Sequence, residues 1–190
     1  MLTSTPAWCA VMTRPGTETA VAKRFEQADD PYGQKPIEYY LPMIANRDKR
    51  YKREMTEKPM FPCYIFAHIT KTQILATRST KDVVFIVTNR HEIITMRDSE
   101  IEAIRRFEAT QRNFQVRETA KLVKGARATI LSGEFAGLEG VLLKGDKDGN
   151  FAVNISVMNM SFVVHIKRSE LRSTDDNESK EEDNRLMNIR

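Results

Sequence analysis

The side chains that most often perform acid–base, nucleophilic or metal chemistry are few in this sequence and lie far apart. The three histidines are His68 at the end of an apolar run, His91 in a polar turn and His165 in a later apolar run. None has a spacing to Cys, Asp or Glu that is typical of a metal site, and a lone histidine is more often structural than catalytic. We therefore expect no metal site and no histidine-based catalytic centre.

Acidic pairs and phosphate-binding loops give no catalytic signal either. Asp29-Asp30 and Asp175-Asp176 place carboxylates side by side, but in a turn and in a charged tail, where water solvates them. The sequence contains neither the glycine loop followed by Lys and Ser or Thr nor a dinucleotide-binding fingerprint. It thus predicts a protein that is not an enzyme and needs no cofactor, and it leaves binding as the function.

Two neighbouring stretches have compositions that suit binding. The first is basic and could contact phosphates, although Glu54 and Glu57 partly offset it and a solvated charged hairpin is the alternative. Its five basic side chains are Arg47, Lys49, Arg50, Lys52 and Arg53. The second is "KPMFPCYIFAHI", residues 58–69, in which Phe61 and Tyr64 flank Pro62 and Cys63. A buried strand explains part of its apolar character, and an aromatic docking patch explains the rest.

The elements that position these residues follow from the apolar periodicity of residues 1–113. We expect strands at residues 8–13, 37–44, 58–69 and 83–87, with Pro42 at an edge or bulge. Helices are expected after Thr17 as a cap, over residues 71–79, and from Asp98 or Ser99, where Ser99 and Glu102 have capping-box spacing. The resulting order is that of a split βαβ fold, an α+β antiparallel sheet with helices on one face.

The texture changes at about residue 121. Six of the eight glycines fall between residues 125 and 149 and separate short runs rich in Val, Ile, Leu and Phe, a pattern typical of a small β-barrel. We expect strands near residues 126–131, 140–144, 151–156 and 161–166. The predicted organisation is a first domain at 1–113, a linker at 114–120, the barrel at 121–172 and an acidic disordered tail at 173–190.

Composition and charge fit a binding protein. Residues 173–190 carry six acidic and three basic side chains, so the net charge of +4 leaves +7 on the rest of the chain, which suits an acidic or phosphate-bearing partner. No apolar run approaches the roughly 18 residues of a membrane span, and we expect a cytoplasmic protein with no membrane partner. Cys9 and Cys63 lie in apolar runs and are expected to be buried free thiols.

Two motifs in their order resemble the NusG family of transcription elongation factors. They are the "FPCYIF" strand, after an opening "WCAVMTRPGTE", and "KGARATILSGEFAGLEGVLLKG", with Gly125, Gly133, Phe135, Gly137 and Gly140 at the spacing of the KOW motif. The resemblance runs from Trp8 to about Arg172. It implies an N-terminal NGN domain followed by a KOW domain, an SH3-like barrel.

The resemblance also implies partners. An NGN domain presents an apolar pocket to the clamp helices of the largest RNA polymerase subunit, and the matching residues here are Trp8, Phe61 and Tyr64; the alternative is that Trp8 and Phe61 only fill the core. The basic segment would lie near non-template DNA. KOW domains of the family engage a small-subunit ribosomal protein or the termination factor Rho, and Phe135 is the candidate contact unless it plugs the barrel.

Some residues depart from the family pattern. Cys63 replaces the usual glycine after the proline, "RSTKDVVFIV" lacks the Pro-Gly common before that strand, and the tail is acidic. These departures favour a specialised paralogue of the RfaH or UpxY type, an operon-specific antiterminator, over a housekeeping NusG. RfaH-like refolding of the second domain into helices is disfavoured by the β-branched run "FAVNISVMNMSFVVHI". A ribosome-associated or RNA-binding protein that uses its KOW barrel alone is the competing class.

Overall fold

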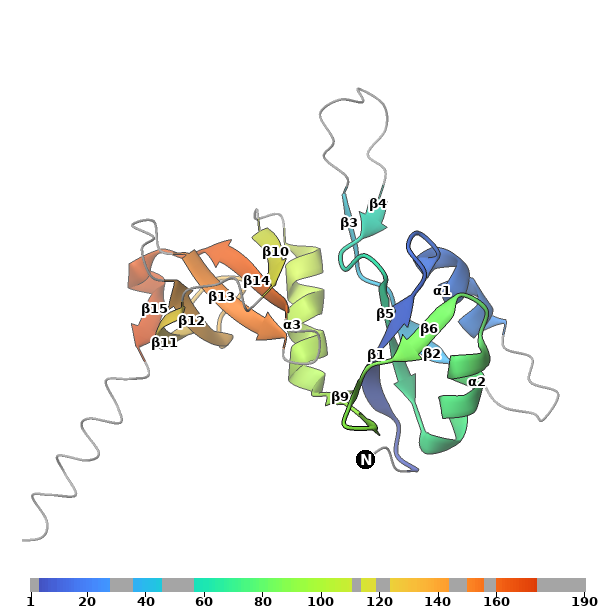
Figure 1. The fold of residues 1–190 in the computed structure, drawn as a ribbon. Helices are drawn as coiled ribbons and strands as arrows, with labels where there is room; N and C mark the ends of the chain where they lie inside the picture. The colour runs from blue at the N-terminus through green and yellow to red at the C-terminus, as the bar shows by residue number, and fades with distance from the viewer. Residues whose placement is uncertain are drawn as a thin grey trace, which may run out of the picture. The chain divides into compact units, whose positions relative to one another are not determined.

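The computed structural model of the chain forms two compact units, Met1–Glu108 and Ala109–Arg190. It describes residues 4–27, 36–45, 57–110, 114–118, 124–143, 150–155 and 160–173. Each unit has its own main sheet, as Figure 1 shows, and its own set of buried apolar residues.

The first unit is built on an antiparallel sheet with the strand order β2-β5-β1-β6, and β9 pairs with the start of β1. The strands are β1 (Ala7–Thr13), β2 (Glu38–Tyr40), β5 (Tyr64–Ile69), β6 (Val83–Ile86) and β9 (Thr95–Met96). The register places Trp8 opposite His68 and Val11 opposite Ile65. The α+β class and the antiparallel sheet predicted for this half are therefore confirmed.

Two helices cover one face of this sheet. They are α1 (Glu18–Glu26) and α2 (Ile74–Ser79), the latter entered through a 3₁₀ turn at Lys71–Gln73, and both lie on the same side of the sheet in Figure 1. Val21 and Phe25, which lie four residues apart on one side of α1, are both fully buried. The core of this first face consists of Cys9, Val11, Val21, Ala22, Phe25, Ile37, Ile65, Ala67, Ile69 and Ile86.

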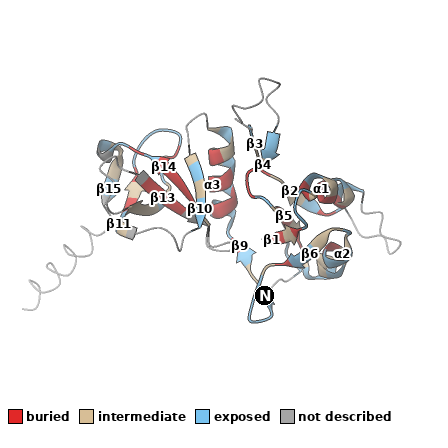
Figure 2. Cartoon of the chain, turned by 45° about the horizontal axis from the view of Figure 1, so that its top comes forward, coloured by how far each residue is buried: buried red, intermediate tan, exposed pale blue. Residues whose placement is uncertain are grey.

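The third helix, α3 (Asp98–Ala109), lies on the opposite side of the sheet, so the expectation that all helices share one face is wrong (Figure 1). Ile101, Ile104 and Phe107 form an apolar stripe that is buried, and Figure 2 shows α3 with one buried and one exposed side. The predicted Ser99–Glu102 box is not the one that forms, because the backbone N–H of Arg97 donates to Glu100 Oε2 at 3.0 Å.

Pro42 and Pro62 divide two of the expected strands. Residues 37–44 split into β2 and β3 (Met43–Ala45), and residues 58–69 split into β4 (Glu57–Pro59) and β5. β3 and β4 pair with each other as a separate hairpin, with Ile44 opposite Lys58. Pro42 is expected at an edge or bulge of one strand, and it lies instead between two strands, because a proline cannot donate to the ladder.

The helix cap at Thr17 differs from the expectation. Thr17 precedes α1, but its hydroxyl donates to the carbonyl of Arg14 at 2.8 Å instead of accepting a helical N–H. A short hairpin of β7 (Thr88–Asn89) and β8 (Glu92–Ile93) follows β6, with Arg90 and His91 in the left-handed region at its turn.

The second unit is an antiparallel sheet of order β10-β14-β13-β12-β11-β15. Its strands are β10 (Phe114–Glu118), β11 (Lys124–Ile130), β12 (Glu139–Leu143), β13 (Asn150–Ile155), β14 (Met160–His165) and β15 (Leu171–Ser173). The run that RfaH-like refolding would make helical contributes β13 and β14, which pair along six positions.

The predicted linker is a strand over most of its length. β10 pairs with β14, and the ring of Phe114 packs edge-on against Phe162 at 5.6 Å. The alternation of Phe114 and Val116 with polar neighbours allows one side of this segment to face the core. Apart from Ser173, the predicted tail lies outside the described residues.

In the described ranges, no helix combines the length and the apolar character needed to cross a membrane.

Candidate protein-docking site

The turn that precedes β5 is held by hydrogen bonds on both sides of Cys63. Phe61, Pro62 and Cys63 form this turn, closed by a hydrogen bond from the N–H of Tyr64 to the carbonyl of Phe61 at 3.1 Å. Cys63 has a φ of 67°, in the left-handed region that favours glycine. Its carbonyl accepts the N–H of Thr13 at 2.8 Å, and its own N–H donates to Glu18 Oε1 at 2.7 Å.

Beyond this turn, an apolar row crosses three strands on the sheet face away from α1 and α2. Met12 of β1 lies opposite Tyr64 of β5 on one side and opposite Phe85 of β6 on the other. Opposite residues of an antiparallel pair point to the same face with their Cβ atoms about 5 Å apart. Met12 and Tyr64 are half-buried and Phe85 is 46% exposed, so the three side chains, here named the apolar row, reach solvent together.

The other two predicted contact residues lie deeper. Trp8 is 7% exposed and Phe61 is 2% exposed. The Trp8 ring stacks on His68 with centroids 4.7 Å apart, and Phe61 packs edge-on against Phe66 at 5.6 Å. Their burial fits the alternative that they fill the core, and only Tyr64 of the predicted trio offers a partly exposed side chain.

α3 covers the β2 side of the same face. The Tyr40 hydroxyl donates to Glu108 Oε2 at 2.5 Å, the N–H of Met43 donates to Glu108 Oε1 at 2.6 Å, and the Arg105 guanidinium lies 5.2 Å from the centre of the Tyr40 ring. Burial and the bond to Glu108 raise the pKa of Tyr40, which stays protonated. These contacts hold α3 over β2, whereas the apolar row lies on β5, β1 and β6.

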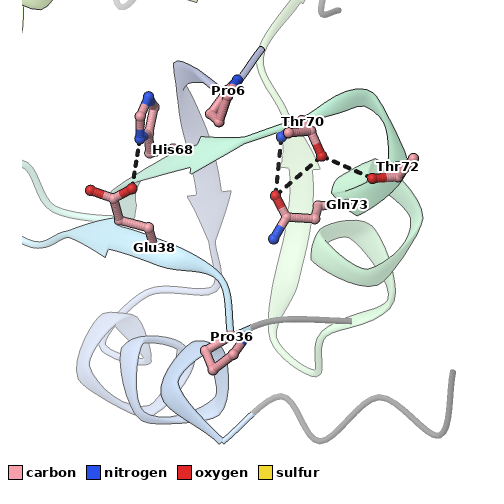
Figure 3. Close-up of a pocket in the computed structure, with 7 residues that line it drawn as sticks. All are labelled: Pro6, Pro36, Glu38, His68, Thr70, Thr72 and Gln73. Atoms are coloured by element: carbon pink, nitrogen blue, oxygen red, sulfur yellow. Dashed lines mark hydrogen bonds and ion pairs between the residues drawn. The ribbon is translucent and has the colours of Figure 1, made fainter. Parts of the chain in front are cut away.

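A pocket of about 380 Å³ lies at the far end of β5 (Figure 3). His68 Nδ1 lies 2.6 Å from Glu38 Oε2, and the Thr70 hydroxyl lies within bonding distance of Thr72 and Gln73. These polar groups bond to one another and include no nucleophile next to a base, so the pocket has no catalytic arrangement. Across the described residues, no three His, Cys, Asp or Glu side chains gather as a metal site would require.

The remaining predicted sites have separate outcomes. Arg47, Lys49, Arg50, Lys52 and Arg53 lie outside the described residues. Phe135 is 1% exposed, which fits the alternative that it plugs the barrel. Cys9 and Cys63 are free thiols as expected, but only Cys9 is buried.

Sequence reasoning missed Met12, Phe85 and Glu18. Alternation along "WCAVMT" places Met12 on the same face as Trp8, and this signal was available. Phe85 could be assigned to that face only through the pairing of β6 with β1, in which the register shifts between Met12 and Thr13. No local pattern indicates that Glu18 reaches a residue 45 positions away.

The chain thus combines an antiparallel α+β unit, which carries one partly exposed apolar row, with an all-β unit. Residues 6–105 match the family model described as NusG, transcription termination factor nusG. The matched residues make up more than half of the chain, and the chain belongs to the NusG family of transcription factors.

One solved structure shares this fold. The structure titled "Domain interaction in Thermotoga maritima NusG" aligns over 89% of this chain and 97% of its own chain. The two are 23% identical and superpose with a TM-score of 0.53, which shows a shared fold. Two conformations, A and B, of an MjSpt4:Spt5 complex match at 16% identity over 88% of this chain, with 97% and 96% of their own chains covered and TM-scores of 0.33 and 0.34. No curated protein matches the chain.

Proposed function

We propose that this protein is a transcription elongation or antitermination factor that binds RNA polymerase through the apolar row of its first unit. The partner is the clamp-helix hairpin of the largest polymerase subunit, as the family resemblance implies. The observation that carries the proposal is the row itself, because Met12, Tyr64 and Phe85 reach solvent on one face of a sheet whose neighbouring side chains are buried.

The chemistry of the row suits a helical partner. A helix packs an apolar stripe into a shallow apolar groove, and aromatic side chains give contact area at a low cost in conformational entropy. Phe61 packs against Phe66, two residues from Tyr64 on β5, whereas Trp8 stacks on His68 at the other end of that strand.

The first experiment is co-purification with core RNA polymerase. Tyr64→Ser with Phe85→Ser removes two exposed contacts, and we expect the affinity for polymerase to fall by at least about tenfold, the scale of an interface anchor. Leu75→Ser is the matched control, because Leu75 is 74% exposed but belongs to α2 on the opposite face. Equal retention of the double variant and the control would contradict the proposal.

The second unit is proposed to be a KOW domain that recruits a second partner, a small-subunit ribosomal protein or Rho. The strand order and the glycines of β11 and β12 support this, while the burial of Phe135 moves the contact to other side chains. Leu131, which directly follows β11, is an exposed apolar residue. Leu131→Glu in the full chain should weaken retention on small ribosomal subunits or Rho and leave polymerase binding unchanged; retention equal to wild type on both would exclude this contact.

The basic segment is proposed to contact non-template DNA, on the strength of its charge. Reversing Arg47, Lys49, Arg50, Lys52 and Arg53 to Glu should weaken binding to an elongation complex most at low salt, because phosphate contacts release counterions. A salt dependence equal to that of wild type would remove this role.

The protein is proposed to be a specialised antiterminator. Cys63 stands in the left-handed position where the family has glycine, and Asp82, directly before β6, also has a positive φ of 72°. Transcription of several unrelated templates tests the proposal: a specialised factor should act only on templates with its DNA element, whereas a housekeeping factor should act on all of them.

A further inference from the structure

Glu18 is a buried carboxylate on the helix that faces away from the apolar row. It is the first residue of α1 and is only 4% exposed, and its Oε1 accepts the N–H of Cys63 at 2.7 Å. A buried carboxylate is costly unless it is bonded. The bond therefore stabilises both groups and joins α1 to the turn before β5.

That turn depends on tertiary bonds. Cys63 holds a left-handed φ of 67° that a residue with a Cβ rarely adopts. The bond from Thr13 to its carbonyl and the bond from its N–H to Glu18 hold the peptide groups on either side of its Cα. Strained conformations persist where surrounding structure determines them.

The turn also sets the position of the docking residues. Phe61, at one end of the turn, packs against Phe66 of β5. Tyr64, at the other end of the turn, begins β5 opposite Met12. A change at Cys63 would shift Tyr64 relative to Met12 and Phe85.

We propose that Glu18 is a positioning residue for polymerase binding: by accepting the Cys63 N–H, it holds the Phe61–Tyr64 turn in the conformation that presents the apolar row. This inference rests on the proposed function of the row. Glu18 does not itself contact the partner, since it lies on α1, on the other face of the sheet.

The two cysteines give a readout that separates the turn from the rest of the sheet. Cys63 is half-buried in the turn, whereas Cys9 is fully buried in the first-face core. Burial raises the pKa of the Cys9 thiol to about 12, which makes it unreactive while the sheet is folded. Local opening of the turn exposes Cys63 alone, and global unfolding exposes both.

The experiment compares three variants of the full chain. Glu18→Ala removes the acceptor, and Glu18→Gln keeps an oxygen that can accept the same bond. Glu100→Ala removes another buried carboxylate, which accepts the backbone N–H of Arg97 directly before α3. Thiol labelling at each cysteine is followed by mass spectrometry, and the affinity for core RNA polymerase is measured at the same temperature.

We expect Glu18→Ala to raise the labelling rate of Cys63 by about tenfold, with Cys9 unchanged, because only the turn opens. Its polymerase affinity should fall by about fivefold or more, on the scale of a displaced contact residue. Glu18→Gln should behave as wild type in both assays, and Glu100→Ala should leave both Cys63 labelling and polymerase affinity unchanged.

Three results would overturn the inference: Cys9 and Cys63 becoming reactive together, Cys63 labelling unchanged in Glu18→Ala, or an opened turn with wild-type polymerase affinity. Failure of wild type itself to bind polymerase would reject the proposed function, and the inference with it. The wild-type arm therefore distinguishes the two failures.

Discussion

At the scale of single residues, Cys63 and Asp82 hold a backbone conformation that usually favours glycine. Cys63 and Asp82 both have a positive φ, and both make tertiary bonds that hold it. The carbonyl of Asp82 accepts the N–H of Arg14 at 2.9 Å, and its carboxylate lies 2.7 Å from Arg24 Nη1. Both turns therefore adopt the left-handed conformation without a glycine.

Restoring glycine at the first of these positions should stabilise the protein. Cys63→Gly removes the strain of a left-handed residue with a Cβ, which is about 1–2 kcal/mol. The greater conformational entropy of glycine in the unfolded chain offsets part of this gain in stability. We expect the free energy of unfolding to rise by roughly 0.5–1 kcal/mol. Urea denaturation followed by the fluorescence of Trp8, the only tryptophan, measures this in the first unit.

Gln27→Gly is the matched control, because Gln27 has a φ of −94° and gains nothing from glycine. It should lower the free energy of unfolding by about 0.5 kcal/mol or more. A Cys63→Gly variant less stable than wild type would show that the Cys63 side chain contributes more than the strain costs.

At the scale of elements, two contacts determine where strands and helices can sit. Glu108 joins α3 to β2 and to the start of the β3–β4 hairpin, because its two oxygens accept bonds from different strands. In the second unit, β12 comes so close to β13 that only a glycine fits at position 140.

Removing Glu108 should release α3 from the sheet. Hydrogen bonds to charged groups contribute about 1.5–3 kcal/mol each, and we expect Glu108→Ala to lower the free energy of unfolding by about that amount in total. Glu102→Ala, on the same helix, removes an exposed pair with Arg106 at 3.5 Å and should cost less than about 0.5 kcal/mol. Trp8 fluorescence in urea compares them, and equal effects would refute the anchoring role.

Gly140→Ala should destabilise the second unit. A Cβ at Gly140 would lie 2.3 Å from the carbonyl oxygen of Ala152 and 2.7 Å from the ring of Phe151, so β12 and β13 must separate. Overpacking of this kind costs about 1–3 kcal/mol. Hydrogen exchange of the β11–β14 amides measures it against Glu139→Ala, an exposed neighbour in the same strand that should change little.

At the scale of the whole molecule, the free energy of unfolding of the first unit depends on pH in the alkaline range. Burial raises the pKa of Cys9 from 9.0 to about 12, and the hydrogen bond to Glu26, then burial, raise that of Tyr39 from 10.0 to about 12. The pKa of Tyr40 rises in the same direction, through burial and its bond to Glu108. All three groups are held protonated by folding.

The sign follows from proton linkage. Since the unfolded chain loses these protons first, the stabilisation is fully present below pH 9 and falls as the pH rises from 9 towards 12. We expect the urea midpoint of the first unit to decline steadily between pH 9 and pH 11, and Cys9→Ala to make the decline shallower. A wild-type midpoint independent of pH over this range would contradict the assignment.

The sequence by itself determined the order of elements and the class of protein. Period-two and period-four apolar patterns place β1, α1, β5 and α3 close to their positions, and the "FPCYIF" and glycine-rich motifs indicate the NusG family. These features are local, because side-chain direction repeats along a strand or helix whatever its partners.

Only the tertiary structure decided which aromatic residues reach solvent. Trp8, Phe61, Tyr64 and Phe85 are all aromatic residues in or beside apolar strands, so sequence does not separate them. Trp8 and Phe61 are buried and Phe85 is 46% exposed, because α3 and the turn cover one part of the face. The strand at Phe114–Glu118 exists because β14 offers it an edge, and Glu18 meets Cys63 because α1 packs beside the turn. Burial and long-range hydrogen bonds depend on which elements meet, and no local pattern of residues carries that information.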